Sequence, residues 1–300
     1  MRKTKKIFLI LATCFFFLGA GIFAIVMSFN GWKFKKIGGH NYQTNSYTIT
    51  EDFNCISIDV DTTDIVIRAS EDGTCKVVCY ETEKVKHIVS VSEGTLIIKT
   101  VDERKFYDKL FGADIALTVY LSKTNNQNLF IKASTGDIEV YKDVSFEMAE
   151  ILLGTGDVAY YANTTESLKV KTSTGDIHVE NISAGIVGLT ASTGDTVVKS
   201  VDCTEFTSEG ATGDIMLENV IATEKLSIER DTGDVQLTAC DAGEIVIETD
   251  TGDVNGTLLS GKTFCAETDT GHIDVPNSSM GGRCQITTDT GDIKIKILEA

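Results

Sequence analysis

The stretch Ser167–Glu180, SLKVKTSTGDIHVE, decides the fold of this chain. Apolar and polar residues alternate on both sides of Gly175, which is the period of a half-buried strand. The stretch therefore predicts a strand, a tight turn at the glycine and a second strand. Glycine suits such a corner because a positive φ costs little without a Cβ atom.

The same Thr-Gly-Asp unit, or a near variant, recurs nine times at steps of 19 or 20 residues. A constant period of this size indicates a repeat architecture. Each unit is too short for a propeller blade, and no helical period interrupts it as in leucine-rich repeats. We therefore expect an all-β fold, a right-handed β-helix or β-solenoid of 19–20-residue coils. The corner glycines are Gly136, Gly156, Gly175, Gly194, Gly213, Gly233, Gly252, Gly271 and Gly291.

Each coil should stack on the preceding one at about 4.8 Å, so that equivalent residues form ladders. The sequence predicts an inward ladder that is aliphatic throughout. The final strand, Ile293–Ile297, carries outward lysines, and we expect these to blunt the exposed end of the stack. A third inward position, seven residues past the glycine, holds Ile182, Val201, Val220, Cys240 and Leu259.

Two segments before the regular repeats depart from the unit. Residues 47–128 keep the alternation, as in Ile56–Ile67, but have lost the glycine. They predict divergent β-coils or an N-terminal cap for a regular solenoid over residues 129–300. Within them, Asp102–Asp114 is charged and aromatic and predicts a projecting loop or short helix.

The N-terminus predicts a membrane anchor. A basic tail over residues 1–6 precedes Ile7–Phe29, 23 uncharged residues that would measure roughly 35 Å as a helix and could cross a bilayer. Basic residues on this flank place the N-terminus in the cytoplasm. A linker over residues 30–46 and the repeats would then lie outside the cell. The alternatives are a cleaved signal peptide, whose apolar region is usually shorter, and a lipoprotein cleavage site at Cys14.

The predicted exterior part is strongly acidic. Without the four basic residues of the tail, 23 basic residues face 44 acidic ones, a net charge of about −21. Such a domain has no electrostatic attraction to nucleic acid or anionic lipid. It could attract cations or basic surfaces, although solvating charges on a repetitive stack are the simpler interpretation.

The cysteines do not predict a disulfide framework or a metal site. Seven of the eight follow Cys14, an odd number. Cys240 and Cys284 fall at inward ladder positions and should pack as small hydrophobes. Cys75 and Cys79 are about 13 Å apart along an extended chain, too far to bind one ion without a turn.

Carboxylates follow the corner glycines in a column, which His272 interrupts in one coil. In the C-terminal half a second acidic column lies two residues before the glycine. Two such columns could bind Ca²⁺ between coils, and the candidate ligands are Asp231, Asp234, Asp250, Asp253, Asp289 and Asp292. We favour a structural role, with each aspartate after the glycine accepting backbone hydrogen bonds as an Asx-type cap. That column comprises Asp137, Asp157, Asp176, Asp195, Asp214, Asp234, Asp253 and Asp292.

No catalytic residue and no cofactor site is predicted. The Asp-Thr-Gly triplets match the core of the aspartic-protease motif, but that chemistry needs two carboxylates from separate lobes at close range. Here the triplets are one repeat apart in a ladder. With four histidines in the chain, no cluster of unlike titratable groups points to a polysaccharide lyase or glycosidase.

The basic N-terminus, the apolar segment and the tandem Ser-Thr-Gly-Asp units, such as Ser173–Ile177 and Ser192–Asp195, resemble the bacterial putative-adhesin family of uncharacterised β-helix proteins, which includes LiaG-like envelope proteins of Gram-positive bacteria. The resemblance covers roughly residues 45–300. It implies a β-helix at the cell surface and supplies no catalytic residues.

These observations favour a single-pass cell-membrane protein whose extracellular solenoid binds an envelope or extracellular protein or glycan without catalysis. The alternative is an accessory component of a cell-envelope stress response that acts through protein contacts. A carbohydrate-active β-helix enzyme is a third, weaker hypothesis. Neither nucleic acid nor a small-molecule cofactor is expected as a partner.

Overall fold

The computed structural model describes residues 41–104, 114–122, 127–277 and 280–298, together with Thr13, Phe15–Gly19 and Gly21. Contacts divide the chain into two units. One comprises Met1–Tyr42 and Glu103–Ala113. The other comprises Gln43–Asp102 and Asp114–Ala300 and is called the solenoid unit below.

The first unit contains few described residues. Phe15–Leu18 are helical, and their side chains are between 61% and 72% exposed. In the described residues, no helix is both long enough and apolar enough to span a membrane. Most of the predicted anchor, Ile7–Phe29, lies outside the described residues, as do the basic tail and most of the predicted linker.

Strands make up nearly all of the solenoid unit. They belong to one continuous sheet that winds around a single core. The strands are β1 (Tyr42–Ile49), β2 (Cys55–Thr62), β3 (Asp64–Ala69), β4 (Cys75–Thr82), β5 (Val85–Ser92), β6 (Thr95–Asp102), β7 (Ala116–Leu121), β8 (Gln127–Thr135), β9 (Ile138–Val140), β10 (Ser145–Thr155), β11 (Val158–Tyr160), β12 (Asn163–Thr174), β13 (Ile177–Thr193), β14 (Thr196–Thr212), β15 (Ile215–Thr232), β16 (Val235–Thr251), β17 (Val254–Leu258), β18 (Lys262–Thr270), β19 (Ile273–Asp274), β20 (Gly282–Thr290) and β21 (Ile293–Ile297).

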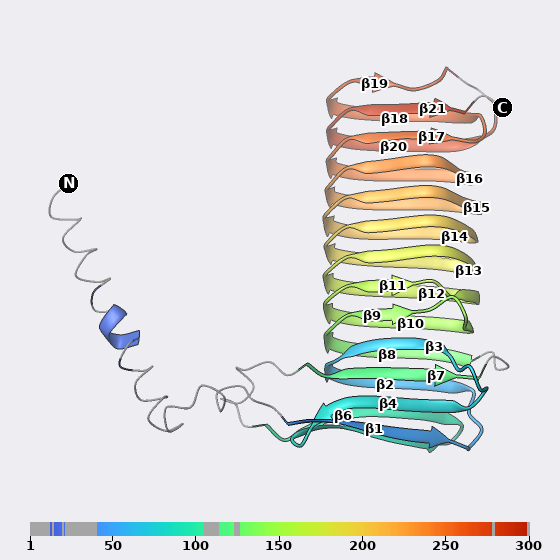
Figure 1. Ribbon diagram of the computed structural model, residues 1–300. Helices are drawn as coiled ribbons and strands as arrows, with labels where there is room; N and C mark the ends of the chain where they lie inside the picture. Colours follow the sequence, from blue (N-terminus) through green and yellow to red (C-terminus); the bar gives the residue numbers. More distant parts are fainter. Residues whose placement is uncertain are drawn as a thin grey trace. The chain divides into compact units, whose positions relative to one another are not determined.

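The central coils stack in parallel and in register (Figure 1). Leu168 lies opposite Val187, which lies opposite Phe206, and the ladder continues through Leu226 and Ile245. Alternation of period two places these side chains inside, where they are fully buried. The predicted all-β solenoid of 19–20-residue coils is therefore confirmed.

The buried ladder is not aliphatic throughout, and that prediction is wrong. Phe206 and Ser208 point inward from β14, and both are fully buried. The reason is Arg230 on the next coil, whose buried guanidinium donates to the hydroxyl of Ser208. Two adjacent coils therefore share a buried polar pair, Ser208 on β14 and Arg230 on β15.

The last coil in the sequence is not the last coil in space. Strand β20 pairs with β16 on one side and with β18 on the other. In the same way, β21 lies between β17 and β19. The coil of β20 and β21 is thus inserted between its two predecessors (Figure 1). The expectation that Ile293–Ile297 forms the exposed end is wrong, because β18 and β19 form it.

The N-terminal end of the stack is also out of sequence order. Strands β2 and β3 pair with β8 and β9 above, and with β6 and β7 below. Strands β4 and β5 then add antiparallel to β7 and β6, and β1 pairs with β4 (Figure 1). We call β1 together with β4–β7 the cap. Residues 105–113, inside the predicted projecting loop, lie outside the described residues.

One predicted inward residue points outward. Leu259 is 46% exposed, and Leu258 takes the inward position opposite Cys240. The neighbouring coils place one residue with positive φ just before this position, for example Ala239 at 53°. Coil β17 lacks that extra residue, so its inward position comes one residue earlier.

The cysteines after Cys14 are all free. Cys240 and Cys284 are fully buried in the ladder, and burial raises the pKa of both thiols. For Cys284 the pKa rises to about 12. Both side chains therefore pack as neutral, small hydrophobic groups.

Candidate functional site

The corner glycines form a close backbone ladder. Their φ angles lie between 127° and 159°, a region that side chains rarely adopt. At each corner a Cβ atom would overlap the carbonyl oxygen of the adjacent coil, as at Gly175 against Gly156. Glycine is therefore needed for two reasons, its backbone conformation and the approach of the neighbouring coil.

The aspartates after these glycines are joined by hydrogen bonds between coils. Oδ1 of Asp157 accepts from the backbone N–H of Asp176 at 2.8 Å, and Oδ1 of Asp176 accepts from Asp195 at 2.8 Å. Each carboxylate thus caps the next coil in space and not its own turn. The complete series runs from Asp64 through Asp137, Asp157, Asp176, Asp195, Asp214, Asp234, Asp253 and Asp292 to His272. We call it the aspartate ladder.

The ends of the aspartate ladder explain the departures from the repeat. His272 lies on the last coil in space, so its side chain has no further coil to cap. At the other end, Thr63 takes the place of the corner glycine beside Asp64. Within the described residues Thr63 is not among those with positive φ. Sequence irregularities therefore mark the two physical ends of the ladder.

The second acidic column, Asp231, Asp250, Asp269 and Asp289, lies exposed beside the aspartate ladder. Within the described residues these carboxylates do not form a group of three ligands close enough to hold a metal ion. Oδ1 atoms of the first column already accept backbone hydrogen bonds, as at Asp234 and Asp253. Calcium binding at these columns stays a prediction.

A row of outward side chains crosses the face built by β2, β6, β8, β10, β12–β16, β18 and β20. Its lysines lie near the cap, while Glu209, Glu229 and Glu248 stand directly opposite one another on adjacent strands. No ion pair among the described residues involves these three glutamates. We call this row the charged row, and in spatial order it reads Lys99, Asp59, Lys132, Leu152, Lys171, Thr190, Glu209, Glu229, Glu248, Thr287 and Glu267.

Like charges on directly opposed strands destabilise a sheet. Three stacked glutamates without an ion-pair partner therefore cost folding free energy. Shallow hollows of about 220 and 210 Å³ lie on the same face and share Glu150 and Leu152. The face is open, and these hollows are too shallow to enclose a small substrate.

A larger hollow of about 430 Å³ lies at the cap, lined in part by Arg68, Asp72 and Lys76. The carboxylate of Asp72 accepts hydrogen bonds from the hydroxyls of Ser70 and Thr74 and from the Thr74 N–H. These bonds hold the pKa of Asp72 well below its usual range. Asp72 therefore stabilises the turn between β3 and β4 in which it lies.

Arg230 is a charged residue that is buried in the solenoid interior. It is 1% exposed, and Nη2 donates to the hydroxyls of Thr196 and Ser208 at 2.9 and 3.2 Å. Its Nε and Nη1 atoms have no hydrogen-bond partner. Burial lowers the pKa of Arg230, and the carboxylates of Asp195 and Asp214 act in the opposite direction. The aspartate ladder thus supplies the nearest compensating charge.

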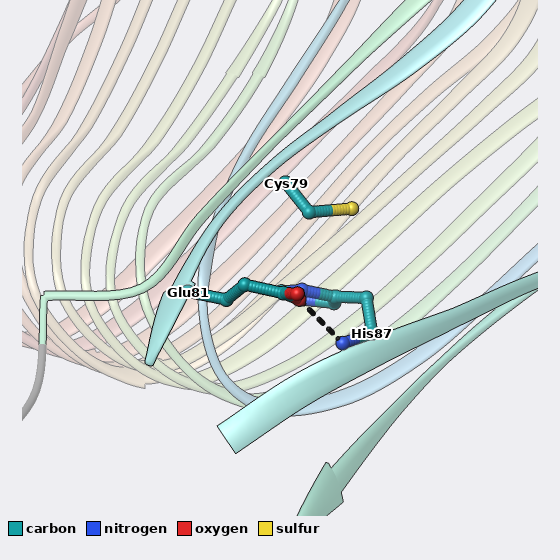
Figure 2. A group of neighbouring side chains, drawn as sticks. All are labelled: Cys79, Glu81 and His87. Atoms are coloured by element: carbon teal, nitrogen blue, oxygen red, sulfur yellow. Dashed lines mark hydrogen bonds and ion pairs between the residues drawn. The ribbon is translucent and has the colours of Figure 1, made fainter. Parts of the chain in front are cut away.

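A group of unlike titratable side chains lies inside the cap. Cys79 and Glu81 project from β4 toward His87 on β5, as Figure 2 shows. All three residues are buried, and one ligand atom from each lies within 4.8 Å of the other two. Among the described residues this is the only such group. We call it the cap cluster.

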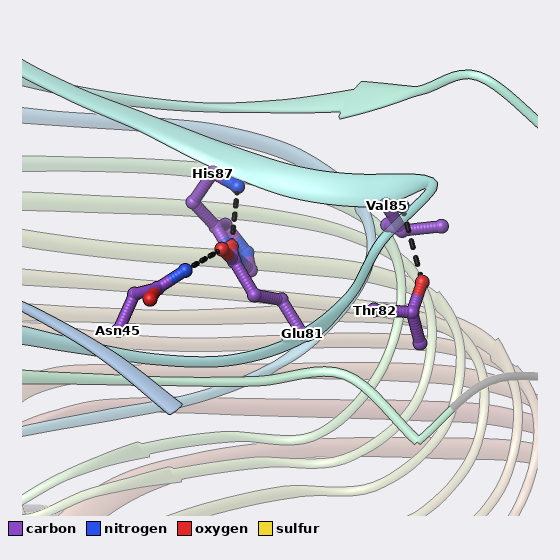
Figure 3. Close-up of polar contacts among 5 residues, drawn as sticks. All are labelled: Asn45, Glu81, Thr82, Val85 and His87. Atoms are coloured by element: carbon purple, nitrogen blue, oxygen red, sulfur yellow. Dashed lines mark hydrogen bonds and ion pairs between the residues drawn. The ribbon is translucent and has the colours of Figure 1, made fainter. Parts of the chain in front are cut away.

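Hydrogen bonds fix the carboxylate of the cap cluster (Figure 3). Glu81 Oε2 accepts from the backbone N–H of His87 at 2.7 Å and lies 3.2 Å from His87 Nδ1. Glu81 Oε1 accepts from Asn45 Nδ2 at 2.5 Å. Val85 donates to the Thr82 hydroxyl at 3.1 Å, which holds the turn between the two strands. In contrast, His87 Nε2 is buried without a partner.

Burial sets the protonation of the cap cluster. It raises the pKa of Cys79 to about 12, with a further contribution from Glu81. It lowers the pKa of His87, although Glu81 acts in the opposite direction. The inaccessible, protonated thiol is unsuited to nucleophilic catalysis. The neutral imidazole, in contrast, keeps a lone pair on one ring nitrogen.

The cap cluster was not predicted from the sequence. Cys75, the nearest cysteine to Cys79 in the chain, lies in the same strand and takes no part. The usable signal was the spacing of Cys79 and Glu81, which places both on one face of a strand. His87 could not be assigned without knowing that β5 folds back beside β4.

Comparison with known proteins agrees with this architecture. The Toastrack DUF4097 family model matches residues 53–242 and 200–300, so the chain belongs to the Toastrack DUF4097 family. No curated protein matches the sequence significantly.

Several solved structures are similar to this chain at low sequence identity. A putative adhesin of Bacteroides fragilis is 18% identical, with 85% of this chain and 97% of that chain covered and a TM-score of 0.46. A putative lipid-binding protein of Parabacteroides distasonis is 14% identical, with 86% and 98% covered and a TM-score of 0.47. A putative adhesin of Parabacteroides merdae is 14% identical, with the same coverage and a TM-score of 0.38. These similarities do not define what this chain binds.

Proposed function

We propose that this protein is a membrane-anchored, extracellular binding protein without catalytic activity, and that the stacked glutamates of the charged row contact its partner. The main support is that Glu209, Glu229 and Glu248 lie opposite one another on adjacent strands and form no ion pair among the described residues. Its electrostatic cost is offset when a cationic surface binds, because opposite charges on a partner remove the repulsion.

The anchor rests on the N-terminal sequence. Ile7–Phe29 carry no charge and are numerous enough to cross a bilayer as a helix. The basic tail supports an N-terminus in the cytoplasm. The proposed organisation is a tail (1–6), an anchor (7–29), a linker (30–46), divergent coils or a cap (47–128) and a right-handed solenoid (129–300) in a LiaG-like protein of a Gram-positive bacterium.

The proposed absence of catalysis rests on the hydrogen bonds that the repeated aspartates already accept from the backbone. Ladder carboxylates such as Asp157 cap the backbone of the next coil. Each repeats the environment of its neighbours, whereas an acid–base pair requires two carboxylates whose environments differ. The charged row likewise offers repeated glutamates and no converging base.

Cross-linking on intact cells tests the proposal. Cells producing the full chain would be compared with a variant carrying Glu209→Gln, Glu229→Gln and Glu248→Gln. A matched control would carry Glu147→Gln, Glu166→Gln and Glu224→Gln, three exposed glutamates outside the row. We expect the wild type and the control to be cross-linked to the same extracellular protein or glycan, and the row variant to lose it.

Equal capture by the row variant and the control would contradict the proposed surface. Capture of a membrane sensor alone would favour the alternative role in an envelope stress response. Activity on a polysaccharide panel, abolished by a single Asp→Asn change in the ladder, would contradict the non-catalytic assignment.

A further inference from the structure

The cap cluster has the composition of a transition-metal site. It combines a thiol, a carboxylate and an imidazole from two strands that are held together by one turn. Zinc in proteins takes these three ligand types, usually with four ligands in a tetrahedron. We propose that Cys79, Glu81 and His87 bind one zinc-type divalent transition metal ion.

The unpartnered nitrogen of His87 is the observation that points to a ligand. Buried polar atoms nearly always have a hydrogen-bond partner, and an orphaned one needs an explanation. His87 Nε2 is buried without one, although Nδ1 of the same ring faces Glu81. In metal sites a carboxylate commonly holds one ring nitrogen of histidine, so that the other nitrogen binds the ion. Glu81 holds His87 in this way.

The distances allow an ion after a small contraction. One ligand atom from each residue, with either ring nitrogen of His87 and either oxygen of Glu81 allowed, lies within 4.8 Å of the other two. Around tetrahedral zinc, a sulfur and a nitrogen ligand are separated by about 3.5 Å. Contraction by roughly 1 Å is within the reach of side-chain rotation. Oε1 of Glu81, which accepts from Asn45, can bind the ion through its remaining lone pair, while Oε2 keeps its contacts with His87.

The protonation of the ligands is compatible with binding. Burial lowers the pKa of His87, which favours the neutral imidazole that binds metal ions. The Cys79 thiol is protonated in the metal-free site, and the ion would displace that proton, as metal binding to cysteine does generally. A buried thiolate beside Glu81 becomes favourable only when a cation compensates both negative charges.

The ion would tie the two strands of the cap to each other. Cys79 and Glu81 come from β4, His87 comes from β5, and Asn45 of β1 holds the carboxylate. These strands lie at the end of the stack, where antiparallel pairing replaces the parallel coils. A metal at this place would stabilise the cap. It is separate from the binding surface proposed on the charged row.

Titration of the metal-free full chain with Co²⁺ in detergent tests the site. Co²⁺ reports a thiolate ligand by a sulfur-to-metal charge-transfer band, which carboxylate ladders cannot produce. We expect one Co²⁺ per chain with this band, and its displacement by Zn²⁺. Zn²⁺ should also raise the melting temperature, because a ligand that binds the native state stabilises it.

Substitutions identify the ligands. Cys79→Ala and His87→Gln should weaken Co²⁺ binding at least about 100-fold and remove the band. Cys203→Ala is the matched control, since that thiol is also buried with its pKa raised to about 12, and it should leave the band unchanged. Absence of the band in the wild-type chain, or binding without a thiolate band, would overturn the proposal even if the variants do not fold.

Discussion

The backbone N–H of His272 donates a hydrogen bond of 2.8 Å to Oδ1 of Asp292, which comes twenty residues later in the chain. Asp292 in turn donates its N–H to Asp253, so the coil of Asp292 lies between the other two. The aspartate ladder therefore follows the order of coils in space. His272 ends the ladder, and its side chain is not required to cap a further coil.

Asp157→Ala should destabilise the protein, and Asp157→Asn should not. Alanine removes the acceptor of the Asp176 N–H, at a cost of about 0.5–1.5 kcal/mol. Asparagine keeps a carbonyl oxygen at the same place and lowers the repulsion between stacked carboxylates. Urea unfolding of the full chain in detergent would measure both changes.

His272→Ala is the control for this prediction, since no coil stacks beyond it. Its free energy of unfolding should lie within about 0.5 kcal/mol of the wild type. Equal losses for Asp157→Ala and Asp157→Asn would show that the negative charge matters and not the hydrogen bond.

Gly210→Ala should lower the free energy of unfolding much more than Gly188→Ala, although Gly210 lies in β14 and Gly188 lies in the neighbouring β13. A Cβ atom at Gly210 would overlap Arg230 Nη1 and lie 2.5 Å from the carbonyl oxygen of Ala191. The guanidinium is buried and the carbonyl belongs to the backbone, so we expect a loss of about 1–3 kcal/mol.

At Gly188 a Cβ atom would meet only Lys169, at an ordinary contact distance of 3.9 Å. Alanine there should be neutral or stabilising by up to about 1 kcal/mol. Thermal unfolding of the two variants would compare them, and equal melting temperatures would contradict the assigned position of Arg230.

Calcium should leave the melting temperature of metal-free protein unchanged. The ladder carboxylates already accept backbone hydrogen bonds, and the second column of Asp231, Asp250, Asp269 and Asp289 is exposed. A ligand specific to the native state must raise stability. Thermal unfolding with excess Ca²⁺ and with chelator measures the difference. A rise that Asp250→Asn with Asp269→Asn abolishes would establish a calcium site.

The repeating part of the fold could be predicted because its physical cause is local. Alternation around Gly175 specifies two strands, and the constant period specifies their stacking. The position of Leu259 could not be predicted, since it depends on one residue of positive φ that its coil lacks.

The order of coils at the two ends depends on pairings between distant segments, which alternation does not encode. Every coil presents the same edge, so β20 can pair with β16 as readily as β18 could. The cap cluster escaped prediction for the same reason. The two irregular corners, Thr63 and His272, can be found in the sequence. Only the hydrogen bonds of the aspartate ladder show that they lie at its two ends.

Disulfide mapping tests most directly the central claim that the aspartate ladder places the final coil inside the stack. Asn255 lies opposite Lys294, and Lys294 lies opposite Asp274. Opposed residues on adjacent strands are about 4.8 Å apart, within disulfide range, whereas two strand spacings exceed it. Oxidation of the Asn255→Cys/Lys294→Cys chain should give this cross-link by peptide mass mapping, and Asn255→Cys/Asp274→Cys should give none. The opposite result, a cross-link only between positions 255 and 274, would contradict the account.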